Sequence, residues 1–289
     1  MKKIFFIVLT GFYINAFSQV GQSLLPIGQL QGNKGNFNTQ IQEYPLFSLM
    51  GFPYKVPTQT SAPSMVSNPW AWWVADTGIT LNVSTVSAWQ DKVLGVSFIQ
   101  NTALAQPTYV AANSIFNGRP YLSFGSSSIT MSAGDTLNLG SLRSMTIVVV
   151  CKMITTSQVQ VLSKANASIP TNIGGYTVSP QIVANATYFQ FCDTTGTRVY
   201  SQSTAILSGE ISVNVINRDV PNISSWTNYL YGATTITNSK QNLVPTDALT
   251  LNTNGGGNFY IMEIIYYNRA LTIGEIGQTI SYAKYKYRL

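Results

Sequence analysis

The 289-residue chain contains no histidine. Because an imidazole is the general base of Ser-His-Asp and Cys-His catalysis, this absence excludes both kinds of nucleophilic catalysis. It also excludes metal sites that need imidazole ligands and lyase chemistry that depends on a histidine base. An enzyme built from this chain would have to use its carboxylates.

Carboxylates are scarce: the chain has ten acidic residues, and the closest two, Glu210 and Asp219, are nine positions apart. Glycosidases need two carboxylates roughly 5 to 9.5 Å apart. Residues i and i+2 of one strand supply such a pair at about 6.5 to 7 Å, but no strand of this chain does so. A pair from different strands, such as Glu210 and Glu263, remains open. The sequence favours a protein that is not an enzyme.

Charge of either sign is also scarce, with 9% charged residues against roughly 25% in an ordinary soluble domain. The net charge of +6 comes from scattered residues, and the only basic cluster is the terminal "KYKYR". No nucleic-acid partner is therefore expected. The polar surface must come from Ser, Thr, Asn and Gln, which is typical of exported β-proteins and virion proteins rather than cytoplasmic enzymes.

Long apolar runs are missing except at the N-terminus. Residues 1–18 are predicted to be a signal peptide, with two lysines, an apolar stretch over Ile4–Phe17, and Ala16 and Ser18 at the −3 and −1 positions before Gln19. The alternative is a buried strand or an uncleaved anchor. No second segment is long enough for a transmembrane helix, and no cysteine follows the leader to carry a lipid anchor.

Only two cysteines occur, Cys151 and Cys192, both in strand-like apolar runs. In an exported protein they could form a disulfide. Two separate buried thiols are the alternative, because sequence alone does not provide the distance between the two Cα atoms.

Residues 19–68 are rich in Gln, Asn, Gly, Pro and Ser and predict an irregular arm or linker, whose apolar run "YPLFSLMGFPY" could dock on the domain or on a partner. From Trp70 onward, short alternating or apolar runs such as "SMTIVVVCKM" and "FYIMEIIYYN" are separated by turn residues. About a dozen such runs predict an antiparallel sandwich or barrel.

Near the C-terminus, the spacing of apolar side chains changes from the alternation of a strand to the period of a helix. In "LTIGEIGQTISYAKYKY" the apolar side chains recur at threes and fours, Thr272 can cap a helix, and Glu275 completes a capping-box pattern. We therefore expect a short C-terminal helix that covers an open sheet edge.

Several runs in this order resemble the laminin-G-like, concanavalin A-like jelly-roll family of bacterial and phage proteins. They are "WWVADTGIT", "VSAWQDK", "QNTALAQPTY", "FNGRPYLSF" and "YYNRALTIGEIGQTISYAKYKYRL". The resemblance implies an all-β fold over residues 69–289, an antiparallel jelly-roll β-sandwich with a short C-terminal helix. One departure is that Gly125 follows Phe124 where relatives often carry an acidic residue.

The resemblance also raises calcium as a ligand, since many laminin-G-type domains bind it. Calcium prefers six to eight oxygen ligands, and the only side-chain candidates in the first half are Asp76, Asp91 and Asp135. The alternative is that these carboxylates are solvated or cap turns. No other cofactor is expected.

Sugar-binding surfaces on β-sandwiches combine an exposed aromatic platform with side chains that hydrogen-bond to hydroxyls. The candidates here lie around "SSWTNYLYG": Trp226, Tyr229, Arg218, Asn222 and Asn228. The alternative is that Tyr229 and Tyr231, two apart on one strand face, belong to the core. Trp73 or Trp89 is expected in the core as well.

These observations predict an exported, non-catalytic binding or adhesion module, secreted or associated with the bacterial outer membrane, that recognises a glycan or a partner protein. A phage virion protein, either a fibre or a capsid decoration with an outward jelly roll, is the alternative. A polysaccharide-cleaving enzyme is the third hypothesis, because the concanavalin A-like fold also hosts such enzymes.

Overall fold

Two long strands, β8 (Met145–Met153) and β17 (Phe259–Tyr267), pair antiparallel at the centre of the fold. Nearly every residue in both is apolar and buried, so both of their faces must be covered. The computed structural model describes residues 62–112, 114–125, 129–137, 144–154, 159–164, 175–179, 188–192, 198–202, 211–219, 222–227, 230–235, 248–252 and 258–289. The predicted signal peptide and most of the predicted arm lie outside them.

The first sheet is built on this central pair. On one side, β8 pairs with β13 (Ile211–Asp219), followed by β14 (Asn222–Thr227) and β15 (Leu230–Thr235). On the other side, two short strands lie in tandem along β17: β1 (Ala71–Val74) and β6 (Tyr121–Phe124).

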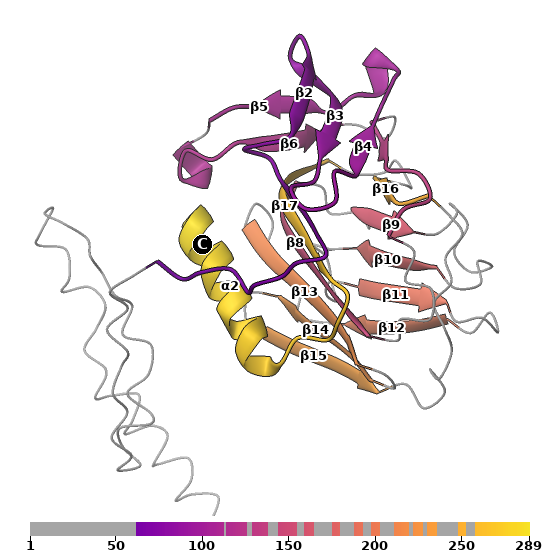
Figure 1. Ribbon diagram of the computed structural model, residues 1–289, viewed down its shortest axis with the longest axis vertical. Helices are drawn as coiled ribbons and strands as arrows, with labels where there is room; N and C mark the ends of the chain where they lie inside the picture. Colours follow the sequence, from indigo (N-terminus) through magenta and orange to yellow (C-terminus); the bar gives the residue numbers. More distant parts are fainter. Residues whose placement is uncertain are drawn as a thin grey trace, which may run out of the picture. The chain divides into compact units, whose positions relative to one another are not determined.

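The second sheet faces the first and runs from β7 to β12. Its strands, in spatial order, are β7 (Met131–Ser132), β16 (Thr250–Leu251), β9 (Leu162–Lys164), β10 (Tyr176–Ser179), β11 (Tyr188–Cys192) and β12 (Arg198–Gln202). Figure 1 shows these strands opposite β8 and β13.

Four small strands join the two sheets at one end: β2 (Ile79–Asn82), β3 (Thr85–Gln90), β4 (Ser97–Ile99) and β5 (Thr108–Val110). Pairing passes from β6 through β5, β3 and β4 to β7. Two 3₁₀ turns, η3 (Ala103–Ala105) and η4 (Ser114–Phe116), lie in the connections. Every described pairing is antiparallel, so the predicted jelly-roll sandwich is confirmed.

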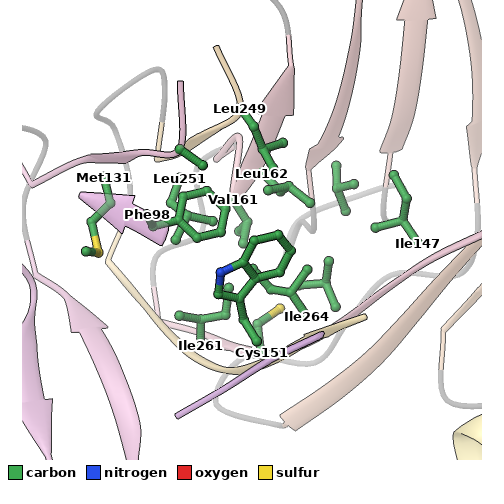
Figure 2. Close-up of a cluster of buried hydrophobic side chains, with 14 of the residues drawn as sticks. Phe98, Met131, Ile147, Cys151, Val161, Leu162, Leu249, Leu251, Ile261 and Ile264 are labelled. Carbon is green, nitrogen blue, oxygen red and sulfur yellow. The ribbon is translucent and has the colours of Figure 1, made fainter. Parts of the chain in front are cut away.

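The interior between the sheets follows the strand alternation. In β8, Ile147, Val149 and Cys151 point into it, whereas Val148 and Val150 point to the opposite face. Figure 2 shows Cys151 and Ile264 of the first sheet in one cluster with Leu162 and Leu251 of the second. Trp73 and Trp89 are both fully buried in this interior, which confirms the prediction for the core.

A β-bulge between Ile261 and Glu263 changes which residues of β17 face the interior. Phe259 and Ile261 face inward before the bulge, and Ile264 and Tyr266 face inward after it. Because a one-residue shift moves every following side chain to the other face, the bulge directs Glu263 away from the interior.

The outer face of the first sheet is covered by helix α2 (Ile273–Tyr287), visible beside β13 in Figure 1. Ile276, Ile280 and Ala283 are buried against Val148, Val150, Val213 and Val215. The predicted helix is thus confirmed, but it covers a sheet face rather than a sheet edge. The reason is that β8 and β17 are apolar on both sides and Val213 and Val215 make the outer side of β13 apolar, so the outer face also needs a cover. No described helix is long and apolar enough to span a membrane.

The start of the helix is held by the capping box that the sequence predicts. Glu275 N–H donates to Thr272 Oγ1 at 3.3 Å, and Thr272 N–H donates to Glu275 Oε2 at 2.9 Å. Arg269 adds two hydrogen bonds to the same carboxylate, at 2.9 and 2.6 Å. Before the cap, the side-chain amide of Asn217 donates to the Leu271 carbonyl and accepts from the Leu271 N–H, as a neighbouring strand would.

The Glu275 cap predicts a loss of stability in acid. Hydrogen bonds from Arg269, and then from the Thr272 backbone, lower the pKa of Glu275 from 4.5 to about 2. Its contribution is therefore complete above about pH 4.5 and is lost as the pH falls towards 2. We expect urea unfolding to show wild type more stable than Glu275→Gln at pH 6, with the difference shrinking over that window. A difference that stays constant down to pH 2.5 would contradict this assignment.

Substitution by alanine at two glycines should change the free energy of unfolding in opposite directions. A Cβ at Gly78, whose φ is +72°, would lie 2.2 Å from the Gln90 carbonyl oxygen, so Gly78→Ala should lower the free energy of unfolding by about 2–4 kcal/mol. Gly277 is helical and a Cβ there meets nothing within 4 Å, so Gly277→Ala should raise it by about 0.5–1 kcal/mol. Chemical denaturation of both variants checks the pair.

Candidate functional site

The residues predicted to contact sugar do not converge on one surface. Arg218 is opposite Met145 in the strand register and is buried on the interior side. Trp226 is opposite Val215 and packs, half-buried, in the cluster under α2. The two therefore point to opposite faces of the first sheet. Asn222 is described only as a backbone partner of Asp219 and Thr235, and Asn228 and Tyr229 lie outside the described residues.

The three aspartates considered for calcium each have a separate partner. Asp76 pairs with Arg119 at 3.7 Å, and Asp135 pairs with Lys164 at 3.3 Å. Asp91 is buried and accepts hydrogen bonds from the backbone N–H groups of residues 93, 94 and 96, at 2.7 to 2.8 Å. Its role is to cap the loop between β3 and β4, which was the alternative reading. Within the described ranges, no group of three acidic or cysteine side chains could hold a metal ion.

Cys151 is a free, buried thiol. Its Sγ accepts from Asn214 Nδ2 at 3.5 Å and lies 3.7 Å from Ser212 Oγ. Burial raises its pKa to about 12, although these two contacts oppose the shift. The structure thus shows the free-thiol alternative for Cys151 rather than a disulfide. The strand partners of Cys151 are β13 and β17, whereas Cys192 is on β11 in the other sheet.

A buried carboxylate organises the space between the first sheet and α2. Glu263 is completely buried and receives four donors. Trp72 Nε1 and Tyr282 OH donate to Oε1 at 2.6 and 3.0 Å, and Lys286 Nζ and Tyr287 OH donate to Oε2 at 3.2 and 2.9 Å. Both oxygens are fully engaged, so this arrangement is suited to holding the helix rather than to transferring a proton.

β1 and the loops after β1, β3 and η4 carry two pairs of partly exposed side chains, Trp72 with Lys92 and Asp76 with Arg119, which together we call the Trp72 rim. The Lys92 ammonium lies 4.3 Å from the centroid of the Trp72 ring, within cation–π range. Asp76 and Arg119 form an exposed ion pair.

The Tyr282 hydroxyl donates to the same Glu263 oxygen as the Trp72 indole N–H does. Burial, and then the charge of Glu263, raise the pKa of Tyr282; Asp76 raises it further, and Arg119 lowers it.

The residues of the rim belong to three of the five sequence runs on which the family resemblance depends. Trp72 and Asp76 come from "WWVADTGIT", Lys92 from "VSAWQDK", and Arg119 from "FNGRPYLSF". From the last of these, Asn117 also donates to the Lys286 carbonyl of α2 at 3.1 Å. No local sequence pattern marks the rim, because its members are up to 47 positions apart. The order of the motif runs is the one signal in the sequence that brings these residues together.

Chemically, the rim offers a half-buried aromatic ring with an ammonium over it, and an exposed guanidinium–carboxylate pair. The exposed cations and the carboxylate can hydrogen-bond to hydroxyl or acidic groups of a ligand, and the exposed part of the indole can contact its apolar surface. The rim is therefore the candidate binding site of the described part of the chain.

The Glu263 network predicts a large loss of stability when its charge is removed. Glu263→Gln leaves Lys286 without its buried counter-ion and sets an amide N–H₂ group against other donors. We expect the free energy of unfolding to fall by about 3 kcal/mol. The matched control is Asp219→Asn, an exposed acidic residue at the end of β13, which should change it by less than about 0.5 kcal/mol. Equal effects of the two substitutions in urea unfolding would show that Glu263 does not anchor the helix.

The sequence matches no protein-family model and no curated protein. Among solved structures, it is similar to domain 4 of an extracellular arabinanase of glycoside hydrolase family 43 from Geobacillus stearothermophilus, solved in complex with arabinotriose. The match has a TM-score of 0.55 and 11% identity, over 74% of this chain and 98% of that domain.

Two further similarities are more distant. The sialidase of Trypanosoma rangeli in complex with sialic acid aligns with a TM-score of 0.47 and 12% identity, over 73% of this chain and 32% of that one. The CBM40 domain of the Ruminococcus gnavus sialidase, bound to α2,3-sialyllactose, aligns with a TM-score of 0.40 and 15% identity, over 47% and 80%. The arabinanase match shows that the chain shares a β-sandwich fold with that domain.

Proposed function

We propose that the chain is an exported, non-catalytic module of the bacterial cell surface or secretome that binds a glycan at the Trp72 rim. The observation that carries the proposal is the rim itself: a half-buried indole with the Lys92 ammonium over its ring, and the exposed Asp76–Arg119 ion pair on the loops after β1 and η4. This is the combination of ring face and hydrogen-bonding groups that a sugar needs for recognition.

The fold supports the same class of ligand. The arabinanase domain that this chain resembles over 98% of its length was solved with an arabinose trisaccharide. The motif runs that resemble laminin-G-like domains add support, because they build the rim. An oligosaccharide with both hydroxyl and acidic groups would suit the two cations of the rim.

The non-catalytic part of the proposal rests on the carboxylates that the structure describes; Glu210, the partner considered for Glu263, lies outside the described residues. Glu263, Asp91 and Glu275 each accept several hydrogen bonds, and Asp76 and Asp135 are in ion pairs. Together with the absence of histidine, this supports binding without bond cleavage. Export is supported by the leader-like residues 1–18 and by the low charge of the chain.

The test is a binding screen of the full chain against soluble polysaccharides, arabinan and acidic glycans included, by affinity electrophoresis and calorimetry. We expect at least one ligand, with no release of reducing ends. Arg119→Ala and Lys92→Ala should each weaken its binding about tenfold, since each removes a charge-assisted hydrogen bond. Tyr285→Ala, an exposed aromatic on α2 outside the rim, is the control and should bind as wild type does.

Three results would overturn the proposal. A folded chain that binds none of the polysaccharides removes the glycan function, and release of reducing ends makes the protein an enzyme. Recovery of the chain from virions with residues 1–18 intact, seen by intact mass, selects the virion alternative over export.

A further inference from the structure

Exposed apolar side chains of the described residues are concentrated in one segment. Of eight large hydrophobic residues that are exposed, six lie between positions 81 and 104: Leu81, Val83, Val93, Leu94, Ile99 and Leu104. The other two, Ile273 and Tyr285, are on α2. The segment forms β2, β3, β4 and η3, at the end of the sandwich where the two sheets join (Figure 1).

The most exposed members are at the turn between β2 and β3 and at the neighbouring loop. Val83 is 94% exposed and Leu104 is 92% exposed. Gln106, two residues after Leu104, accepts from Asn82 Nδ2 at 3.2 Å and from Thr85 Oγ1 at 2.7 Å. The turn and the loop are thereby joined, and we call Leu81, Val83 and Leu104 the apolar tip.

The tip is rigidly mounted. The Gln106 side chain is buried and donates to the Gln100 carbonyl at 2.7 Å, and the Gln100 side chain donates in turn to the Thr130 carbonyl at 2.8 Å. On the other side, the Ser84 carbonyl accepts from the Tyr109 N–H at 2.9 Å. A surface held in this way loses little conformational freedom when it is covered.

Val83 occupies a position that is unfavourable for valine. Asn82 pairs with Thr85, so the loop between β2 and β3 has two residues, Val83 and Ser84. Val83 has a φ of +60°, which β-branched residues rarely adopt and which glycine normally supplies in such loops. Neither backbone geometry nor burial within the described residues explains an aliphatic side chain here.

The tip also lacks charge. Residues 77–118 include only two charged side chains, Asp91 and Lys92. Asp91 is buried in its loop, and Lys92 lies over the Trp72 ring at the opposite end of β3 from the tip. The polar neighbours of the tip are Asn, Ser and Thr, which leave water at far lower cost than ions do.

We propose that the apolar tip inserts into the interfacial layer of a lipid bilayer. Single aliphatic side chains that protrude from an uncharged, rigid loop can enter the acyl region without bringing a charge with them. A protein pocket fits less well, because the residues that dominate protein interfaces are Trp, Tyr and Arg, with Leu and Val under-represented. A glycan fits less well still, since the tip has no aromatic ring.

This inference is independent of the Trp72 rim, so the two proposals can fail separately. The tip would hold the module against a membrane while the rim binds a glycan, and each contact would raise the effective concentration of the other. Substitutions in the tip should therefore leave glycan binding in solution unchanged.

Flotation of the full chain with phosphatidylcholine vesicles, with and without phosphatidylglycerol, tests the inference. We expect wild type to float at millimolar lipid with both compositions and at high salt. Val83→Asp and Leu104→Asp should each lower the partition coefficient about tenfold or more, because each replaces a buried aliphatic group with a charge. Ile273→Asp is the matched control: it is an 81% exposed aliphatic at the start of α2 and should float as wild type does.

The variant Val83→Gly distinguishes a loss of membrane binding from a loss of folding. Glycine relieves the positive φ, so this variant should have a higher melting temperature than wild type while it floats less. The inference is overturned if wild type does not float, if flotation needs anionic lipid and is lost at high salt, or if the tip variants float as wild type does. It is also overturned if size-exclusion chromatography shows a wild-type dimer that Val83→Asp dissociates without any change in flotation.

Discussion

The buried carboxylate of Glu263 is the constraint on which the arrangement of the sandwich and its helix depends. A carboxylate at zero exposure is tolerable only with donors at both oxygens, because an unpaired buried charge is strongly unfavourable. Here the four donors come from β1 and from three positions of α2, more than 190 residues apart in the chain. Satisfying this one group therefore fixes where the first strand and the last helix must lie.

The bulge in β17 makes that constraint possible. Without the register shift between Ile261 and Glu263, the alternation of the strand would turn the carboxylate into the apolar interior. With it, Glu263 faces α2, and the valines of β8 and β13 on the same face supply the apolar contact that holds the rest of the helix. The cap at Thr272 and the amide of Asn217 then set where the helix begins.

The same arrangement separates two surfaces with different chemistry. The Trp72 rim lies where β1, the loop after β3 and the helix meet, and it combines charge with an aromatic ring. The apolar tip is at the far end of the β2–β3 hairpin and combines exposure with absence of charge. The proposed polar ligand and the proposed lipid surface would therefore contact different elements of the fold.

Local pattern was sufficient to predict several features from the sequence. Alternation and β-branched runs predicted the antiparallel sandwich, the three-four spacing with Thr272 and Glu275 predicted the helix and its cap, and the indoles of Trp73 and Trp89 were rightly expected in the core. These features depend on interactions between residues close in the chain or on burial alone, which a single sequence records.

What only the tertiary structure decided is which distant residues meet. The sequence placed Arg218 and Trp226 in one sugar site, yet they are on opposite faces of the sheet, because strand register rather than proximity in the chain sets the side of each. Three further features also depend on tertiary contacts. The helix covers a sheet face rather than a sheet edge, the Cys151 thiol is free, and the Asp91 carboxylate caps the loop between β3 and β4. The sequence by itself determined the elements and their periodicity. The strand register and one bulge, which depend on long-range pairing, decided which side chains meet under the helix and which face each strand residue takes.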